Sequence, residues 1–394
     1  MIALLAAAVI QAGTVVEWFD ATPKYVSIQA VIKIPKLDNR NRNLLRLIVG
    51  SLGKNTKTYS ATQISDVAGR TGSRVRTTLM EDHIRVGFDV VSVDLSLGVS
   101  MMGAILKDSI INPQDLDAVS NDLQFREFSF WRSAISLNSF ETPKYTLKEF
   151  ADLTAVVLRP ENITLGVGGN IQPGLATNKW EEIKAKWLLP RKPELSLSQD
   201  NPPTPETKGS MNVFDFQGPT LSATDAAFTT KLLALTALGT GKSASLWRVA
   251  REKLGLSYRQ EAVLYPTQEG FLPRLLIAHS GKEDLEKKGT QLREGLIEDI
   301  NQWTDEDRQR AIGMAASYLV RGGDMSPLYL MPDRPVSRDL GDQVFLMAYW
   351  SMKTGNRWNP HQLVGRLGFV EIEDLKKSAL EFIEKATLKI HSTR

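Results

Sequence analysis

Hydrophobic residues in the first half of the chain follow two periods. Apolar and polar residues alternate over 26–34 and again over 84–90, which is typical of half-buried strands. Leucine and isoleucine follow helical spacing over 44–48, and a capping-box pattern over 60–63 predicts the start of a second helix. Asp94 precedes a third apolar helical pattern. The pattern predicts a strand, two helices, a strand and a further helix.

The second half repeats this order. Its expected elements are a strand at 214–216, a helix at 228–235, a turn at Gly239 and Gly241, a helix at 246–250, strands at 258–265 and 271–279, and a helix at 285–300. A final helix over 375–383 and a strand over 388–390 complete it. An order that occurs twice indicates an internal repeat. The chain therefore predicts an α+β fold with two similar domains, each a mostly antiparallel sheet with helices packed on one face.

A proline-rich segment separates the two repeats. Residues 191–210 contain four prolines among many polar residues, which suits an extended linker. We expect an N-terminal domain over 14–190 and a C-terminal domain over 211–394. Within the first, the glycine-rich stretch 166–169 predicts a strand that another part of the backbone approaches closely.

Residues 1–13 form an apolar run that ends in small residues. The run resembles the core of a secretory signal but lacks a basic region, since the first lysine is Lys24. The alternative is a buried first strand. We favour export to a bacterial periplasm or envelope, with a cytoplasmic location as the alternative. No later segment reaches about 18 consecutive apolar residues, so we expect no membrane span.

Composition removes several classes of chemistry. With 48 basic and 45 acidic residues, the charge is too balanced to predict nucleic-acid binding. The absence of cysteine excludes disulfides, thiolate metal sites and cysteine nucleophiles. None of the four histidines has a second histidine at metal-helix spacing, and we expect no metal or other cofactor in this chain. They are His83, His279, His361 and His391.

Candidate chemistry concentrates in the second half, over 239–258. The segment Gly239-Thr240-Gly241-Lys242-Ser243 resembles a phosphate loop, but Thr236 stands where that motif needs glycine and a helix precedes it. We expect a flexible turn between helices that lines a peptide cavity. Arg251 and Tyr258 follow, seven residues apart, near the end of a helix and on the next strand.

This block resembles the glycine-rich turn, helix and strand that carry the paired Arg and Tyr of pitrilysin/insulinase-type zinc peptidases. Three further stretches are similar to that family: 53–58, 112–116 and 159–171. The inverted zinc motif His-x-x-Glu-His occurs nowhere in the 394 residues. Counting back from residue 56, Arg46 and Gly50 stand where the two histidines belong, and Val49 replaces the general-base Glu. These side chains can neither bind zinc nor take a proton from water.

The resemblance implies a non-catalytic subunit of a two-chain metalloendopeptidase. A homologous partner would carry His-x-x-Glu-His and zinc, and the heterodimer would cleave unstructured peptides. This chain would contribute Arg251 and Tyr258, whose donors suit a carbonyl oxygen that gains charge. The alternative for the pair is that Arg251 pairs with Glu252 and Tyr258 packs in a core. Two alternatives remain for the chain: a scaffold subunit of a larger complex, and a peptide-binding homodimer.

Overall fold

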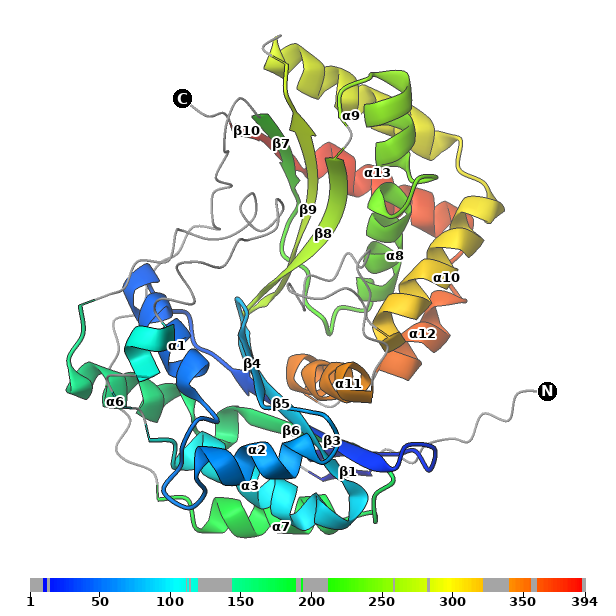
Figure 1. The fold of residues 1–394 in the computed structure, drawn as a ribbon. Coiled ribbons are helices and arrows are strands. Elements are labelled where there is room, and N and C mark those ends of the chain that lie inside the picture. The colour runs from blue at the N-terminus through cyan, green and yellow to red at the C-terminus, as the bar shows by residue number, and fades with distance from the viewer. Residues whose placement is uncertain are drawn as a thin grey trace. The chain divides into compact units, whose positions relative to one another are not determined.

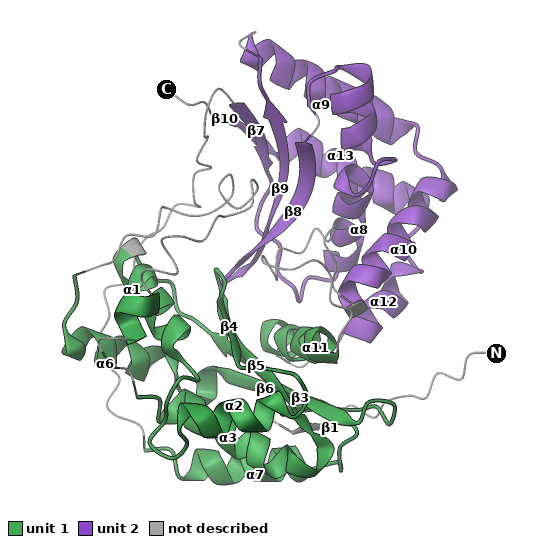
Figure 2. Cartoon of the chain, viewed as in Figure 1, with its two compact units in different colours: residues 1–126, 139–201, 338–356 green, residues 127–138, 202–337, 357–394 purple. Residues whose placement is uncertain are grey.

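The computed structural model describes residues 10–12, 15–110, 112, 115–119, 144–188, 193, 212–257, 259–281, 284–321, 340–355 and 360–391. The chain divides into two compact units (Figure 2). Unit 1 contains residues 1–126, 139–201 and 338–356, and unit 2 contains residues 127–138, 202–337 and 357–394. Apart from Pro193, the linker expected over 191–210 lies outside the described residues.

Unit 1 is built on a six-stranded sheet with the order β1-β2-β6-β3-β5-β4 (Figure 1). Its strands are β1 (Ile10–Ala12), β2 (Val15–Phe19), β3 (Tyr25–Lys33), β4 (Arg76–Leu79), β5 (His83–Val91) and β6 (Ile163–Gly169). Strands β2 and β6 pair in parallel, and all other neighbours pair antiparallel. Part of the segment 1–13 thus forms β1, which pairs with β2.

One face of this sheet carries the hydrophobic core of unit 1. Among the described residues, the longer helices of the unit are α1 (Asn39–Ser51), α2 (Ala61–Gly69), α3 (Leu95–Lys107), α6 (Leu147–Val157) and α7 (Leu175–Ala185), together with α11, which is described below. The even-numbered residues of β3, from Val26 to Ile32, are buried in one cluster with residues of α1 and α3. The capping box at Ser60 and Gln63 is present at the start of α2, which confirms the helix start expected there.

The opposite face of the same sheet is covered by one helix from late in the chain. Helix α11 (Leu340–Thr354) packs against β3 and β6 (Figure 1). It approaches closely because β6 carries glycines: a Cβ atom added at Gly166 would lie 2.8 Å from the carbonyl oxygen of Val344. The close approach expected at 166–169 is therefore confirmed. The division of the sequence at the linker did not anticipate that α11 belongs to unit 1.

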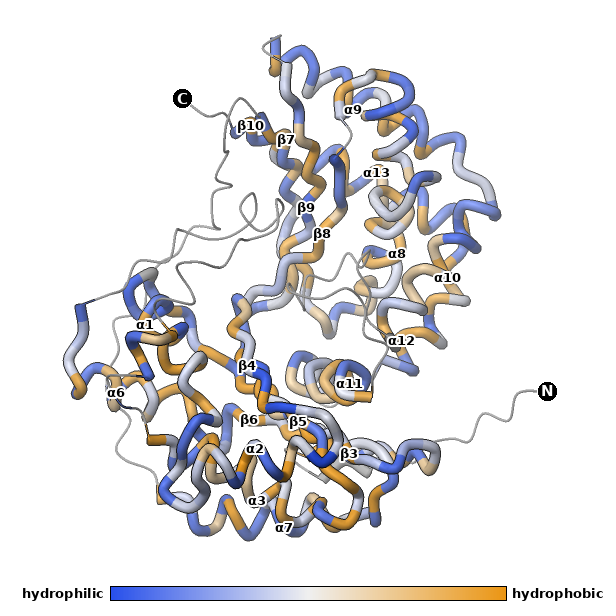
Figure 3. Tube along the Cα trace, viewed as in Figure 1, coloured by the Kyte–Doolittle hydropathy of each residue, from blue (hydrophilic) through white to orange (hydrophobic). Residues whose placement is uncertain are grey.

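Unit 2 contains a four-stranded antiparallel sheet with the order β10-β7-β9-β8. Its strands are β7 (Asn212–Gln217), β8 (Arg259–Thr267), β9 (Gly270–His279) and β10 (Thr387–His391). Its helices are α8 (Phe228–Gly239), the π-helix η3 (Trp247–Lys253), α9 (Leu285–Asn301), α10 (Asp305–Arg321), α12 (Pro360–Leu367) and α13 (Ile372–Lys385). Strand β9 is hydrophobic along most of its length (Figure 3).

Helices α8 and α9 lie on the sheet of unit 2, and α9 contacts the face that carries Phe214 and Phe216. Helices α10 and α12 pack on α8. A Cβ atom added at Gly289 of α9 would lie 2.5 Å from Leu388 and 3.7 Å from Phe214, which shows how closely α9 lies on the sheet. The two units thus share the expected architecture, an α+β fold with mostly antiparallel sheets, and that expectation is confirmed. Within the described residues, no helix is both long and apolar enough to cross a bilayer.

Candidate functional site

The positions of the missing zinc motif lie on α1 in unit 1. Asp38 caps this helix by accepting a hydrogen bond from the Asn41 backbone N–H at 2.7 Å. The Arg46 guanidinium donates to Oδ1 of Asn43, one turn earlier, at 2.9 Å. The Val49 side chain is 4% exposed and belongs to the hydrophobic core. A cation and a buried isopropyl group offer no ligand to zinc.

At Gly50, the space that the second histidine side chain of the zinc motif would need is already filled. A Cβ atom added at Gly50 would lie 2.4 Å from Cγ1 of Val119, a separation that real Cβ atoms essentially never show. Val119 belongs to the short helical segment 115–119 and is itself buried in the same core. The residues present therefore do not fit a zinc ion, both because donors are missing and because the site is packed with hydrocarbon.

The other acids and histidines described do not replace those ligands. Asp115 lies 3.4 Å from the Lys54 ammonium, and its backbone N–H donates to Oδ1 of Asn112. His83 is fully buried beside Asp82, with 2.7 Å between Nδ1 and the carboxylate. His279 contacts the carbonyl oxygen of Leu256. Among the described residues, no group of three His, Cys, Asp or Glu is arranged to hold a metal ion.

Unit 2 carries the predicted substrate-binding arginine. Arg251 lies on η3, and its guanidinium carbon is 4.2 Å from the centroid of the Trp247 ring, a cation–π contact. Lys242 places its ammonium 5.7 Å from the same ring. The indole N–H of Trp247 donates to Glu252 at 3.0 Å. The half-buried Trp247 ring therefore orients Arg251.

A charged network anchors the turn before η3. Nε and Nη2 of Arg248 donate to the two oxygens of the Asp299 carboxylate, at 2.8 and 2.7 Å. Nη1 of Arg248 donates to the Asp307 carboxylate at 3.2 Å. Arg248 donates as well to the carbonyl oxygen of Ser243 within the turn. Burial would raise the pKa of Asp299, but the bonds from Arg248 outweigh it and lower that pKa. The bidentate pair fixes η3 to α9.

The two glycines of the turn have distinct reasons to be glycine. Gly239 ends α8 against β8, where an added Cβ atom would lie 2.2 Å from Cβ of Ala262. Gly241 has a φ of 84°, a left-handed conformation that side chains disfavour. Gly239 is thus required by close packing and Gly241 by backbone geometry. Tyr258 lies outside the described residues, so its place relative to Arg251 stays a prediction.

The sequence analysis did not identify Trp247, which contacts Arg251, or Val119, which packs against Gly50. Trp247 stands four residues before Arg251 on a helix, and this spacing could have indicated their contact. Val119 gave no signal, because its contact with Gly50 joins residues far apart in the chain.

Comparisons with solved structures identify the fold. The chain is similar to a peptidase M16 inactive domain from Pseudomonas fluorescens, with a TM-score of 0.71, 14% identity, and 97% of each chain covered. It is similar to a protease from Helicobacter pylori, with a TM-score of 0.67, 14% identity, and 95% of this chain and 96% of the other covered. A conserved protein from Enterococcus faecalis V583 matches at a TM-score of 0.63 and 12% identity, with 96% of each chain covered. The sequence matches no family model and no curated protein.

The chain therefore has the fold of a peptidase M16 inactive domain, which confirms the fold that the pitrilysin/insulinase resemblance implied. At 12–14% identity this similarity concerns the fold and not the activity.

Proposed function

We propose that this chain is the non-catalytic, substrate-binding subunit of a two-chain zinc metalloendopeptidase that cleaves unstructured peptides. The observation that carries the proposal is a contrast between two places on the chain. The zinc-motif positions are occupied by non-ligands, and Val119 packs against Gly50. Arg251, by contrast, is half-buried and its guanidinium lies over the Trp247 ring.

In this proposal a homologous partner carries His-x-x-Glu-His and its zinc. Arg251 and Tyr258 of this chain bind the peptide backbone and donate to the carbonyl oxygen as it gains charge. Because Trp247 restricts the guanidinium, little side-chain entropy is lost when Arg251 binds its ligand. The anchored turn from Gly239 to Ser245 forms part of the peptide-binding wall.

The first test is purification of the chain from its native cells followed by mass spectrometry. The expected result is a near-stoichiometric partner that contains His-x-x-Glu-His, and chelator-sensitive cleavage of an unstructured peptide by the complex. Recovery of the chain alone, or with unrelated subunits, contradicts the proposal. Zinc-dependent cleavage by the isolated chain contradicts it as well.

A second test separates substrate binding from a scaffold role. In the complex, Arg251→Ala should lower kcat by about 100- to 1,000-fold, the usual effect of losing one oxyanion donor, while assembly is retained. Arg70→Ala is the matched control, because Arg70 forms an exposed ion pair with Asp94 in unit 1. If complexes that contain the two variants cleave the peptide at the same rate, Arg251 has no role in cleavage, and the scaffold alternative gains support.

A further inference from the structure

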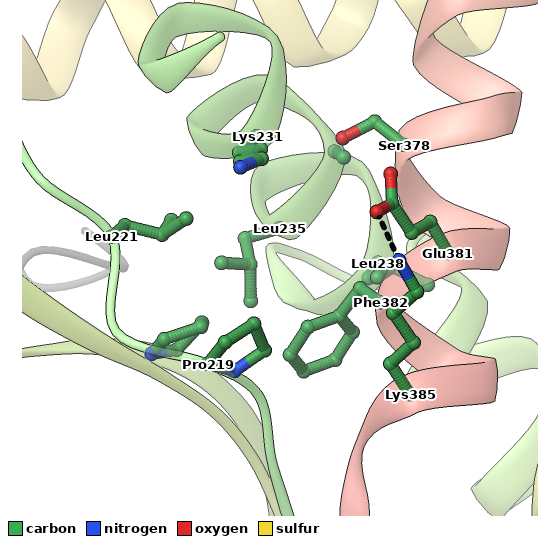
Figure 4. A pocket seen from close by; sticks show the side chains of 11 residues that line it. Pro219, Leu221, Lys231, Leu235, Leu238, Ser378, Glu381, Phe382 and Lys385 are labelled. Atoms are coloured by element: carbon green, nitrogen blue, oxygen red, sulfur yellow. Dashed lines mark hydrogen bonds and ion pairs between the residues drawn. The ribbon is translucent and has the colours of Figure 1, made fainter. Parts of the chain in front are cut away.

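Unit 2 contains an apolar pocket between α8 and α13 (Figure 4). Its inner wall is formed by Leu235 and Leu238 of α8 and by Pro273 of β9, and all three are buried. Phe382 of α13 forms the facing wall. The pocket is open to solvent on one side and offers about 50 Å³ of space. One water molecule needs about 10–15 Å³ of such space, so the pocket holds roughly three to five non-hydrogen atoms of a ligand.

The walls of this pocket are fixed before any ligand arrives. Leu221, which also lines it, exchanges two backbone hydrogen bonds with Phe271 of β9, at 2.7 and 2.8 Å. The Gly218 N–H donates to the carbonyl oxygen of Pro273 at 3.0 Å. A Cβ atom added at Gly218 would lie 2.6 Å from the Phe382 ring, so this glycine permits the wall to form. Because the apolar pocket is already formed, the protein loses little conformational entropy when a ligand binds.

Positive charge exceeds negative charge at the mouth of the pocket. Lys231, Lys385 and Glu381 line it, and the Lys385 ammonium lies 2.7 Å from the Glu381 carboxylate. That hydrogen bond and the charges of Lys385, Lys231 and Lys377 lower the pKa of Glu381. Lys231 also lies 3.4 Å from Asp225. Among the residues that line the pocket, two ammonium groups thus meet one carboxylate, which leaves one positive charge in excess.

The existing ion pairs do not prevent an added anion from binding. The Lys231 and Lys385 side chains are 34% and 64% exposed, and exposed pairs contribute little stability. A ligand carboxylate can therefore share these ammonium groups at small cost. An aliphatic chain attached to it can enter between Leu235, Leu238 and Phe382 and leave water.

We propose that this pocket binds a short aliphatic carboxylate of roughly four to six carbons, with its chain in the pocket and its carboxylate at Lys231 and Lys385. This site is separate from the proposed peptide-binding function, and its test does not depend on a partner subunit.

The test is a calorimetric titration of the isolated full-length chain with hexanoate, with hexylamine and hexanol as matched probes. Hexanoate should saturate one site with a Kd on the order of 1 mM, as expected for so few buried atoms. Hexanol should bind more weakly and hexylamine should not bind. Equal affinity for hexanoate and hexylamine would overturn the proposal, and so would the absence of saturable hexanoate binding.

Two variants locate the site. Leu235→Trp fills the pocket and should abolish hexanoate binding in protein that retains its native melting transition. The double reversal Lys231→Glu and Lys385→Glu changes one half-buried and one exposed lysine and should weaken binding at least tenfold. Lys148→Glu is the control, because Lys148 is an exposed lysine of α6 in unit 1. Hexanoate affinity that is unchanged by the double reversal contradicts the assignment, even if Leu235→Trp fails to fold.

Discussion

Replacing Asp82 by Asn tests how α11 is held on the first sheet. Asp82 is 2% exposed, between β4 and β5, and its carboxylate contacts three groups. His83 Nδ1 lies at 2.7 Å, the Lys353 ammonium at 2.6 Å and the Tyr349 hydroxyl at 3.1 Å. Lys353 and Tyr349 belong to α11. The variant keeps the size of the side chain but leaves the Lys353 ammonium, 7% exposed, without its carboxylate.

The expected loss follows from the burial of that charge. Removing one partner of a buried ion pair costs about 3–5 kcal/mol, because the other charge stays buried without compensation. Combining Asp82→Asn with Lys353→Met should recover most of that loss, since the orphaned charge is then gone. Asp94→Asn is the matched control: its pair with Arg70 is largely exposed and should contribute less than about 1 kcal/mol.

The dependence of stability on pH gives an independent check. Burial alone would raise the pKa of Asp82, but His83 and Lys353 outweigh it and lower that pKa to about 2. A lowered carboxyl pKa contributes stability that is present above the unfolded value of 3.8 and is lost as pH falls through the folded value. The shift corresponds to about 2 kcal/mol, lost between about pH 4 and pH 2. Asp82→Asn should remove this part of the acid sensitivity.

The assay is hydrogen–deuterium exchange of peptides from α11, combined with urea denaturation. Exchange reports the local opening of α11, which matters because a chain of two units need not unfold in one step. Faster exchange confined to α11 and the first sheet is expected for Asp82→Asn. Equal protection of the α11 amides from exchange in Asp82→Asn and in Asp94→Asn would contradict this role of Asp82. A double variant that is less stable than Asp82→Asn alone would contradict it as well.

Three further changes test packing and charge. Gly50→His should destabilise unit 1 by about 1–3 kcal/mol through overpacking, and adding Val119→Ala should restore part of the loss in urea denaturation. Gly239→Ala should cost at least as much, because the added Cβ would meet Cβ and the backbone of Ala262, which cannot swing aside. Gly313→Ala, by contrast, has open space on α10 and should stabilise by about 0.5–1 kcal/mol. Burial raises the pKa of Glu261 to about 7 from 4.5, so the folded state binds more protons and stability falls between these pH values. At pH 8 the Glu261→Gln variant should therefore be more stable than the unchanged protein by up to about 3 kcal/mol. Solvent reaches the half-buried carboxylate, and this makes the gain smaller. A loss of stability at pH 8 would contradict the expectation.

Local sequence patterns predicted most elements of the fold, because strand alternation, helical spacing and caps involve residues close together in the chain. The alternation over 26–34 corresponds to β3, and Ser60 with Gln63 starts α2 as expected. The loss of the zinc ligands needed only residue identity: a cation at 46 and hydrocarbon at 49 cannot bind zinc in any fold.

Only the tertiary structure decided which distant groups meet. Helix α11 lies on the first sheet because glycines of β6 leave room for it and because Asp82 pairs with Lys353, and neither contact has a local signature. The packing of Val119 against Gly50 likewise joins segments distant in the chain. Trp247 and Arg251 are neighbours on one helix, yet their contact needs rotamers and burial that sequence spacing does not specify. The sequence by itself thus determined the elements and the missing chemistry, whereas packing and charge pairing between remote residues arose only when the chain folded.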